Sequence, residues 1–170
     1  MKYHNITKDD MLNGDGLRVV LWVSGCTIKC EGCQNPCTWD FDDGIEFDES
    51  AKQEIFSELD KDYISGITLT GGHPLEENHY ETIKDLCKEI KDKYPDKTIW
   101  LYSGWDWKTI CIAMFKILPY IDVLIDGSFQ IDKKDTSLMW RGSSNQRVID
   151  VQACLKDINH HMLNPILHCK

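Results

Sequence analysis

The 170-residue chain has an ordinary globular composition, with 42% hydrophobic and 28% charged residues, and a formal net charge of −9. Phosphate contacts need a basic face, so this acidic balance excludes a general nucleic-acid binder. No apolar run approaches the ~20 residues of a membrane span, and the N-terminus lacks a secretory signal pattern, so we expect a cytoplasmic protein without membrane contact.

Strand-like and helix-like segments alternate along the chain. Short apolar runs predict five strands, over residues 17–23, 66–70, 98–102, 121–125 and 147–151. Apolar residues at three- and four-residue spacing predict helices over residues 50–59, 78–93 and 105–117. The first of these helices is expected to start at a capping box formed by Ser50 and Gln53.

Repeated strand–helix units imply a parallel sheet with right-handed crossovers. Such a sheet can stay open or can curl into a partial barrel. We expect the second: an α/β fold whose parallel sheet, of about five or six strands, forms a partial TIM-like (β/α) barrel. Four strands are each followed by an unusual segment: the cysteine cluster, Gly71-Gly72, Ser103-Gly104 and Asp126-Gly127. Such folds place their active sites at the C-terminal ends of parallel strands, so these segments are expected to form one shared site.

Four of the eight cysteines fall within residues 25–39, which read GCTIKCEGCQNPCTW. Among them, Cys26, Cys30 and Cys33 have the spacing C-x3-C-x2-C. Three thiolates can hold three corners of a [4Fe–4S] cubane and leave the fourth iron open, whereas ordinary electron-transfer clusters use four cysteines. Other interpretations stay open: a zinc site, disulfides or inert buried thiols, and a closed cluster with Cys37 as its fourth ligand.

The C-x3-C-x2-C motif after a first strand resembles the hallmark of the radical S-adenosylmethionine superfamily. Most of the chain resembles, more closely, the small activating enzymes of anaerobic (class III) ribonucleotide reductase. The matching segments are NGDGLR at 13–18, the cysteine segment at 25–39, TLTGGHPL at 68–75, WLYSGW at 100–105, DVLIDGSF at 122–129 and WRGSSNQR at 140–147. The resemblance ends near Val151, so we expect a radical S-adenosylmethionine domain over residues 1–151 and a C-terminal tail over residues 152–170.

This resemblance implies an enzyme. Its [4Fe–4S] cluster on the three cysteines would cleave S-adenosylmethionine reductively, and the 5′-deoxyadenosyl radical would take a hydrogen atom from a glycine of the anaerobic ribonucleotide reductase large subunit. The resemblance also implies a low-potential electron donor such as flavodoxin or ferredoxin, and self-association into a homodimer. Two alternatives stay open: an activating enzyme for another glycyl-radical enzyme, and a non-catalytic iron–sulfur electron-transfer module.

The resemblance also assigns roles near the cysteines. It implies that the backbone of Gly71 and Gly72 hydrogen-bonds the methionyl amino group, although a strand-to-helix turn alone would also need such glycines. His73 departs from the family pattern, which has an acidic residue there, and a histidine accepts a hydrogen bond only when it is neutral. Gly32 and Gln34, beside the last cysteine, are expected to lie against the adenine or ribose.

Further candidates follow the third strand and those after it. Ser103 is expected to line the cofactor cavity or to pack in a surface loop, and Asp126 to bind a ribose hydroxyl or to start a turn. Arg141 and Asn145 are expected to complete the cofactor pocket or to dock the glycine loop of the reductase. The tail carries metal-ligand residue types that we expect to hold no metal: His160, His161, His168 and Cys169.

Overall fold

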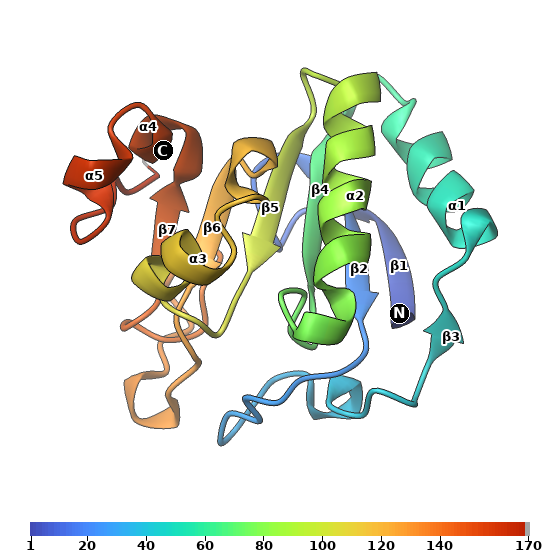
Figure 1. Cartoon of the computed structure of the whole chain (residues 1–170). Coiled ribbons are helices and arrows are strands. Elements are labelled where there is room, and N and C mark those ends of the chain that lie inside the picture. Colours follow the sequence, from blue (N-terminus) through green and yellow to red (C-terminus); the bar gives the residue numbers. More distant parts are fainter. Residues whose placement is uncertain (169–170) are drawn as a thin grey trace.

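A seven-stranded sheet organises the chain, and the computed structural model describes residues 1–168 (Figure 1). The strands are β1 (Lys2–Asp10), β2 (Leu17–Val23), β3 (Ile45–Glu46), β4 (Ile64–Gly71), β5 (Thr98–Tyr102), β6 (Val123–Asp126) and β7 (Arg147–Asp150). The α-helices are α1 (Glu49–Leu59), α2 (Glu77–Lys93), α3 (Trp107–Ala113), α4 (Val151–Leu155) and α5 (Ile158–His161). Across residues 1–168, every helix is too short or too polar to cross a lipid bilayer.

The predicted parallel sheet in a partial TIM-like barrel is wrong, because the sheet is mixed and open. Its order is β3-β1-β2-β4-β5-β6-β7, and within the described residues the two edge strands do not pair to close it. The central strands β2, β4, β5 and β6 are parallel. β1 is antiparallel to β2 and to β3, and β7 is antiparallel to β6. The connections from β1 to β2 and from β6 to β7 contain no α-helix, whereas a parallel pair would need a long crossover connection.

Successive side chains along each strand point to opposite faces of the sheet. In β5, Ile99 and Leu101 join the main core with residues of α1, α2 and α3, whereas Trp100 joins a smaller cluster on the other face. Figure 1 shows these three helices on the same side of the sheet. Within residues 1–168, no layer of α-helices covers the opposite face, which is left for loops and a cavity.

A buried arginine holds one of these loops across the open face. Arg18 in β2 is fully buried and donates to Thr68 Oγ1 at 2.8 Å and to the carbonyl oxygen of Thr98 at 2.9 Å. Burial lowers the pKa of Arg18 to about 10. Thr68 in turn donates to the carbonyl oxygen of Asn13 at 2.7 Å, so the connection from β1 to β2 is fixed against the sheet.

The helices begin and end at identifiable residues. Asp48 caps α1 by accepting from the backbone nitrogen of Ala51 at 3.0 Å, so the predicted capping box at Ser50 is wrong. α2 agrees with its predicted range to within one residue. α3 is shorter than predicted, because Asp106 caps it by accepting from the backbone nitrogen of Thr109 at 2.8 Å and residues 114–117 form a bend and turns.

After α5 the chain returns to the outer edge of β7. Asp150 donates its backbone N–H to the carbonyl of Ile166, and His168 donates to the carbonyl of Val148, both at 2.9 Å. The His168 ring also packs edge-on against Trp100, with the ring centroids 5.3 Å apart. The tail therefore docks on the sheet as far as residue 168, and Cys169 lies outside the described residues.

Candidate functional site

The cysteine loop, residues 24–44, leaves the C-terminal end of β2 and closes on itself. Gly25 and Cys26 donate their backbone N–H groups to the carbonyls of Thr38 and Trp39, at 2.8 and 3.1 Å. Gly25 has a φ of +100°, and a Cβ there would lie 2.3 Å from the Phe41 ring, so only glycine fits. This closure fixes the position of Cys26 at the base of the loop.

The three cysteines of the motif line one cavity of about 200 Å³, and each is a free thiol. Cys26 is buried, and Cys30 and Cys33 are half-buried. Burial raises the pKa of the Cys26 and Cys30 thiols, so these thiols need a metal or another positive charge to ionise at neutral pH. Cys37 is exposed and borders a separate hollow, which it shares with Cys26.

No three His, Cys, Asp or Glu side chains in residues 1–168 form a ready-made site for a metal ion. The three thiols therefore share a cavity without defining a coordination geometry by themselves. Their donor chemistry suits an iron–sulfur cluster, which is held by cysteine thiolates. The assignment of Cys26, Cys30 and Cys33 as ligands stays a prediction.

The two glycines after β4 bring that strand against the cysteine loop. Gly71 has a φ of +94°, and a Cβ on Gly72 would lie 2.3 Å from the carbonyl oxygen of Gly25. Gly72 donates to the carbonyl of Val23 at 2.8 Å. Close packing therefore requires glycine at both positions, and both residues also line the cavity.

His73 lies at the wall of the cavity and is almost fully buried. Its Nδ1 lies 3.3 Å from Glu76 Oε1 and its Nε2 lies 2.9 Å from Ser103 Oγ, while Trp105 packs edge-on against the ring. Burial lowers the pKa of His73, so the ring is neutral at neutral pH. Ser103, which lines the same cavity, also accepts from the backbone of Trp105 at 3.0 Å.

Glu76 is a residue of this site that the sequence analysis missed. Its Oε1 accepts from both the backbone nitrogen and the Oγ1 of Thr27, each at 2.7 Å. Burial alone would raise the pKa of Glu76, but the hydrogen bonds from Thr27 and the nearby His73 lower it below its ordinary value. In the sequence, Glu76 has only the signature of an acidic residue at a helix N-terminus.

The structure places the remaining predicted residues in two groups. Gln34 lines the cavity, and Gly32 lies next to the cavity residue Cys33, where a Cβ would meet Ile131 at 2.8 Å. Asp126, Arg141 and Asn145 are not among the residues that line the cavity. The residues that complete its wall include Asn13, Trp22, Tyr102, Phe129 and Gln146.

Asp126, Arg141 and Asn145 make contacts within the protein. The buried Asp126 carboxylate accepts two hydrogen bonds from Arg147 and one, at 2.7 Å, from the backbone nitrogen of Trp107. Arg141 donates to the carbonyl of Gln146 at 2.6 Å, and Asn145 donates to the carbonyl of Ser128 at 2.8 Å. These contacts fix the loop between β6 and β7, which contributes Phe129, Gly142 and Gln146 to the cavity.

Comparisons with known proteins identify the family of the chain. Residues 12–149 match the family described as a 4Fe-4S single cluster domain, so the chain is an iron–sulfur protein. It is 43% identical over 148 residues to the anaerobic ribonucleoside-triphosphate reductase-activating protein of Enterobacteria phage T4, covering 87% of this chain and 93% of that protein. The protein of the same name from Pasteurella multocida is 43% identical over 150 residues, which cover 86% of this chain and 95% of that protein. The one from Escherichia coli is 39% identical over 150 residues, which cover 87% of this chain and 97% of that protein. The chain belongs to the family of anaerobic ribonucleoside-triphosphate reductase-activating proteins.

Proposed function

We propose that this chain activates an anaerobic ribonucleotide reductase by cleaving S-adenosylmethionine reductively and generating a glycyl radical on the large subunit of the reductase. One observation carries the proposal. Cys26, Cys30 and Cys33 line the same cavity as Gly71 and Gly72, at the C-terminal edge of the parallel strands. Membership of the family of reductase-activating proteins supports the choice of partner.

In this proposal, Cys26, Cys30 and Cys33 hold a [4Fe–4S] cluster as thiolates. When bound, the cluster would supply a low-potential electron for the reductive cleavage of S-adenosylmethionine. Cys37 is exposed and is not among the residues that line the cavity, which supports three protein ligands rather than four.

The other cavity residues bind, orient and exclude water. Gly71 and Gly72 line the cavity without side chains, so their backbone forms that part of the wall facing the methionyl group. Trp22, Tyr102 and Phe129 give the cavity aromatic walls, and exclusion of water from such walls protects a reactive radical from side reactions. Gln34 offers a polar group on the same wall.

The proposal includes the electron donor, the cellular location, the oligomeric state and the domain organisation of the enzyme. The electron donor is a low-potential flavodoxin or ferredoxin, the enzyme works in the cytoplasm, and two copies form a homodimer. Residues 1–151 form the radical S-adenosylmethionine domain, and residues 152–170 form an appended tail. The family match, which ends at residue 149, supports this division.

Anaerobic reconstitution with iron and sulfide tests the proposal. The reduced protein should release methionine and 5′-deoxyadenosine from S-adenosylmethionine, and in the presence of the reductase it should produce a glycyl radical detectable by electron paramagnetic resonance. A stable brown protein that never consumes S-adenosylmethionine would instead be an electron-transfer module. Cleavage without a radical on the reductase, but with one on another glycyl-radical enzyme, would reassign the partner.

A further inference from the structure

A buried carboxylate lies directly behind the cysteine loop. Glu76 is 7% exposed, and its Oε1 accepts two hydrogen bonds from Thr27, the residue that follows Cys26. The carboxylate is therefore close enough to act on the electrostatics of the predicted cluster ligands.

The same carboxylate connects the cysteine loop to two other loops. His73, in the turn after β4, donates Nδ1–H to Glu76, because a carboxylate can only accept. His73 Nε2 must then accept from the hydroxyl of Ser103, after β5, at 2.9 Å. The loops after β2, β4 and β5 are thus joined through one chain of hydrogen bonds in which each donor has an acceptor.

The charge of this network is negative and has no cationic partner. Burial keeps His73 neutral, and Thr27 and Ser103 carry no charge. Within residues 1–168, His73 is the basic group at ion-pair distance from Glu76, and no lysine or arginine reaches it. A buried charge is poorly screened by solvent, so its field extends to the neighbouring cavity.

We infer that Glu76 is a positioning residue of the iron–sulfur site, which holds the loop carrying Cys26 against the glycine turn (residues 71–73) and lowers the reduction potential of the cluster. The inference rests on the proposed function for its ligand set. Reduction adds an electron to the cluster, so a fixed negative charge nearby makes that step less favourable. A lower potential makes the reduced cluster a stronger one-electron donor.

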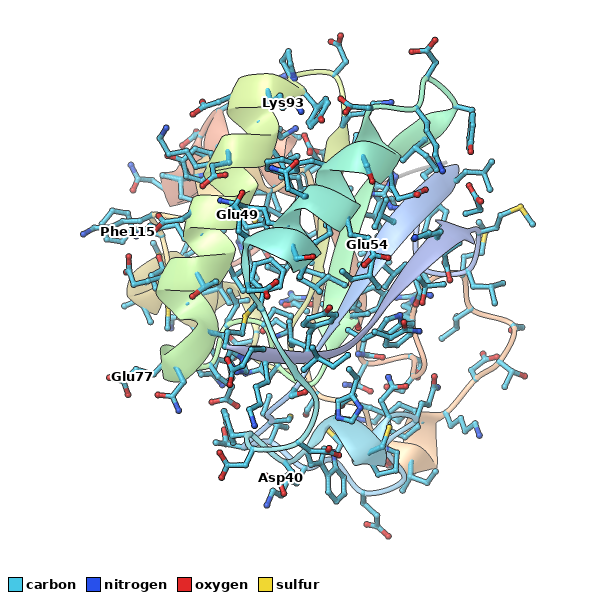
Figure 2. The ribbon with its side chains drawn as sticks, turned by 90° about the vertical axis from the view of Figure 1, so that its right-hand side faces the viewer. Asp40, Glu49, Glu54, Glu77, Lys93 and Phe115 are labelled. Carbon is cyan, nitrogen blue, oxygen red and sulfur yellow. The ribbon has the colours of Figure 1, made fainter. Side chains whose placement is uncertain are left out.

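Glu76→Gln tests the charge, because glutamine keeps an oxygen that accepts from Thr27. The matched control is Glu77→Gln, which removes the same charge from the next residue. Glu77 is exposed, and Figure 2 shows it extending outward from the start of α2. A potentiometric titration of the reconstituted protein, without S-adenosylmethionine or reductase, should show a more positive potential for Glu76→Gln and the wild-type potential for Glu77→Gln. Equal potentials in both variants would overturn the role of the charge.

Thr27→Val tests the positioning without changing any charge, and it applies even if Glu76→Gln does not fold. This variant loses one of the two hydrogen bonds to Glu76, so retention of the cluster against a chelator should fall on the order of 10-fold. Thr27→Ser keeps the hydroxyl and should retain the cluster like the wild type. If Thr27→Val also retains it like the wild type, the positioning role is wrong.

These outcomes are separate from those of the proposed function. If the wild-type chain binds no [4Fe–4S] cluster, the ligand assignment fails before any variant is compared. If the cluster forms and its potential does not respond to Glu76→Gln, only the present inference fails.

Discussion

His73 Nδ1 lies 3.3 Å from Glu76 Oε1, so the histidine of the glycine turn donates to a buried carboxylate. Its other nitrogen accepts from Ser103. Both nitrogens are therefore engaged within the protein, and an amino group bound in the cavity must find its acceptor elsewhere. His73 thus serves to join loops.

Aspartate at position 73 should destabilise the protein while Glu76 keeps its charge. His73→Asp would bring two carboxylates together in a buried place, and the lost hydrogen bonds should cost about 2 kcal/mol of the free energy of unfolding. Adding Glu76→Gln should recover most of this loss. Urea unfolding of the single and double variants measures both effects, and an unchanged single variant would contradict the contact.

The cysteines should divide into two groups when each is replaced by alanine. Cys26→Ala, Cys30→Ala and Cys33→Ala should each abolish cleavage of S-adenosylmethionine, because each removes a proposed ligand. Cys37→Ala should leave cleavage largely intact, since Cys37 is exposed and does not line the cavity that the other three cysteines share. Iron content and release of 5′-deoxyadenosine are the measurements, and loss of the cluster in Cys37→Ala would overturn the ligand set.

Mild acid should destabilise the fold through its buried histidines. Burial lowers the pKa of both His73 and His79 from 6.5, so the unfolded chain takes up these protons first as the pH falls. The contribution of these two histidines to stability should therefore decrease below pH 6.5 and become constant below the lowered pKa values. His79→Gln should show a shallower decrease in unfolding free energy between about pH 7.5 and about pH 5.5. A slope equal to that of the wild type would show that His79 does not contribute.

A methyl group at position 72 should separate the glycine turn from the cysteine loop. Gly72→Ala places its Cβ 2.3 Å from the carbonyl oxygen of Gly25, and the backbone must move to relieve the clash. We expect a loss of about 2 kcal/mol or more in the free energy of unfolding, together with weaker cluster retention. Gly127→Ala is the control: its nearest neighbouring atom lies 3.8 Å away, so it bears only the strain of a positive φ, about 1 kcal/mol.

Hydrophobic pattern predicted the central elements well. The strand at 17–23 and the helix at 78–93 were placed to within one residue, because their apolar residues face a continuous core. β1 was missed because only Tyr3 and Ile6 of its nine residues are buried, which leaves a mostly polar segment. The direction of β7 was also missed, since strand direction depends on a loop whose path is set by tertiary hydrogen bonds.

The sequence predicted the site only where one residue type in a short motif indicates a function, as the cysteines and the paired glycines do. Cysteine spacing and the paired glycines pointed to residues that do line one cavity. Glu76 was not found, because its importance depends on Thr27, which is 49 positions away in the sequence. Asp126 was considered for a ribose contact, and its pairing with Arg147 across β6 and β7 is likewise visible only in three dimensions.

The return of the chain to β7 limits how two copies can associate. Ile166 and His168 already occupy outward-facing backbone groups of that strand. A second copy could add a strand to this edge of the sheet only after the segment with Ile166 and His168 had dissociated from β7. A homodimer that keeps these residues in place must therefore be built from another part of the surface.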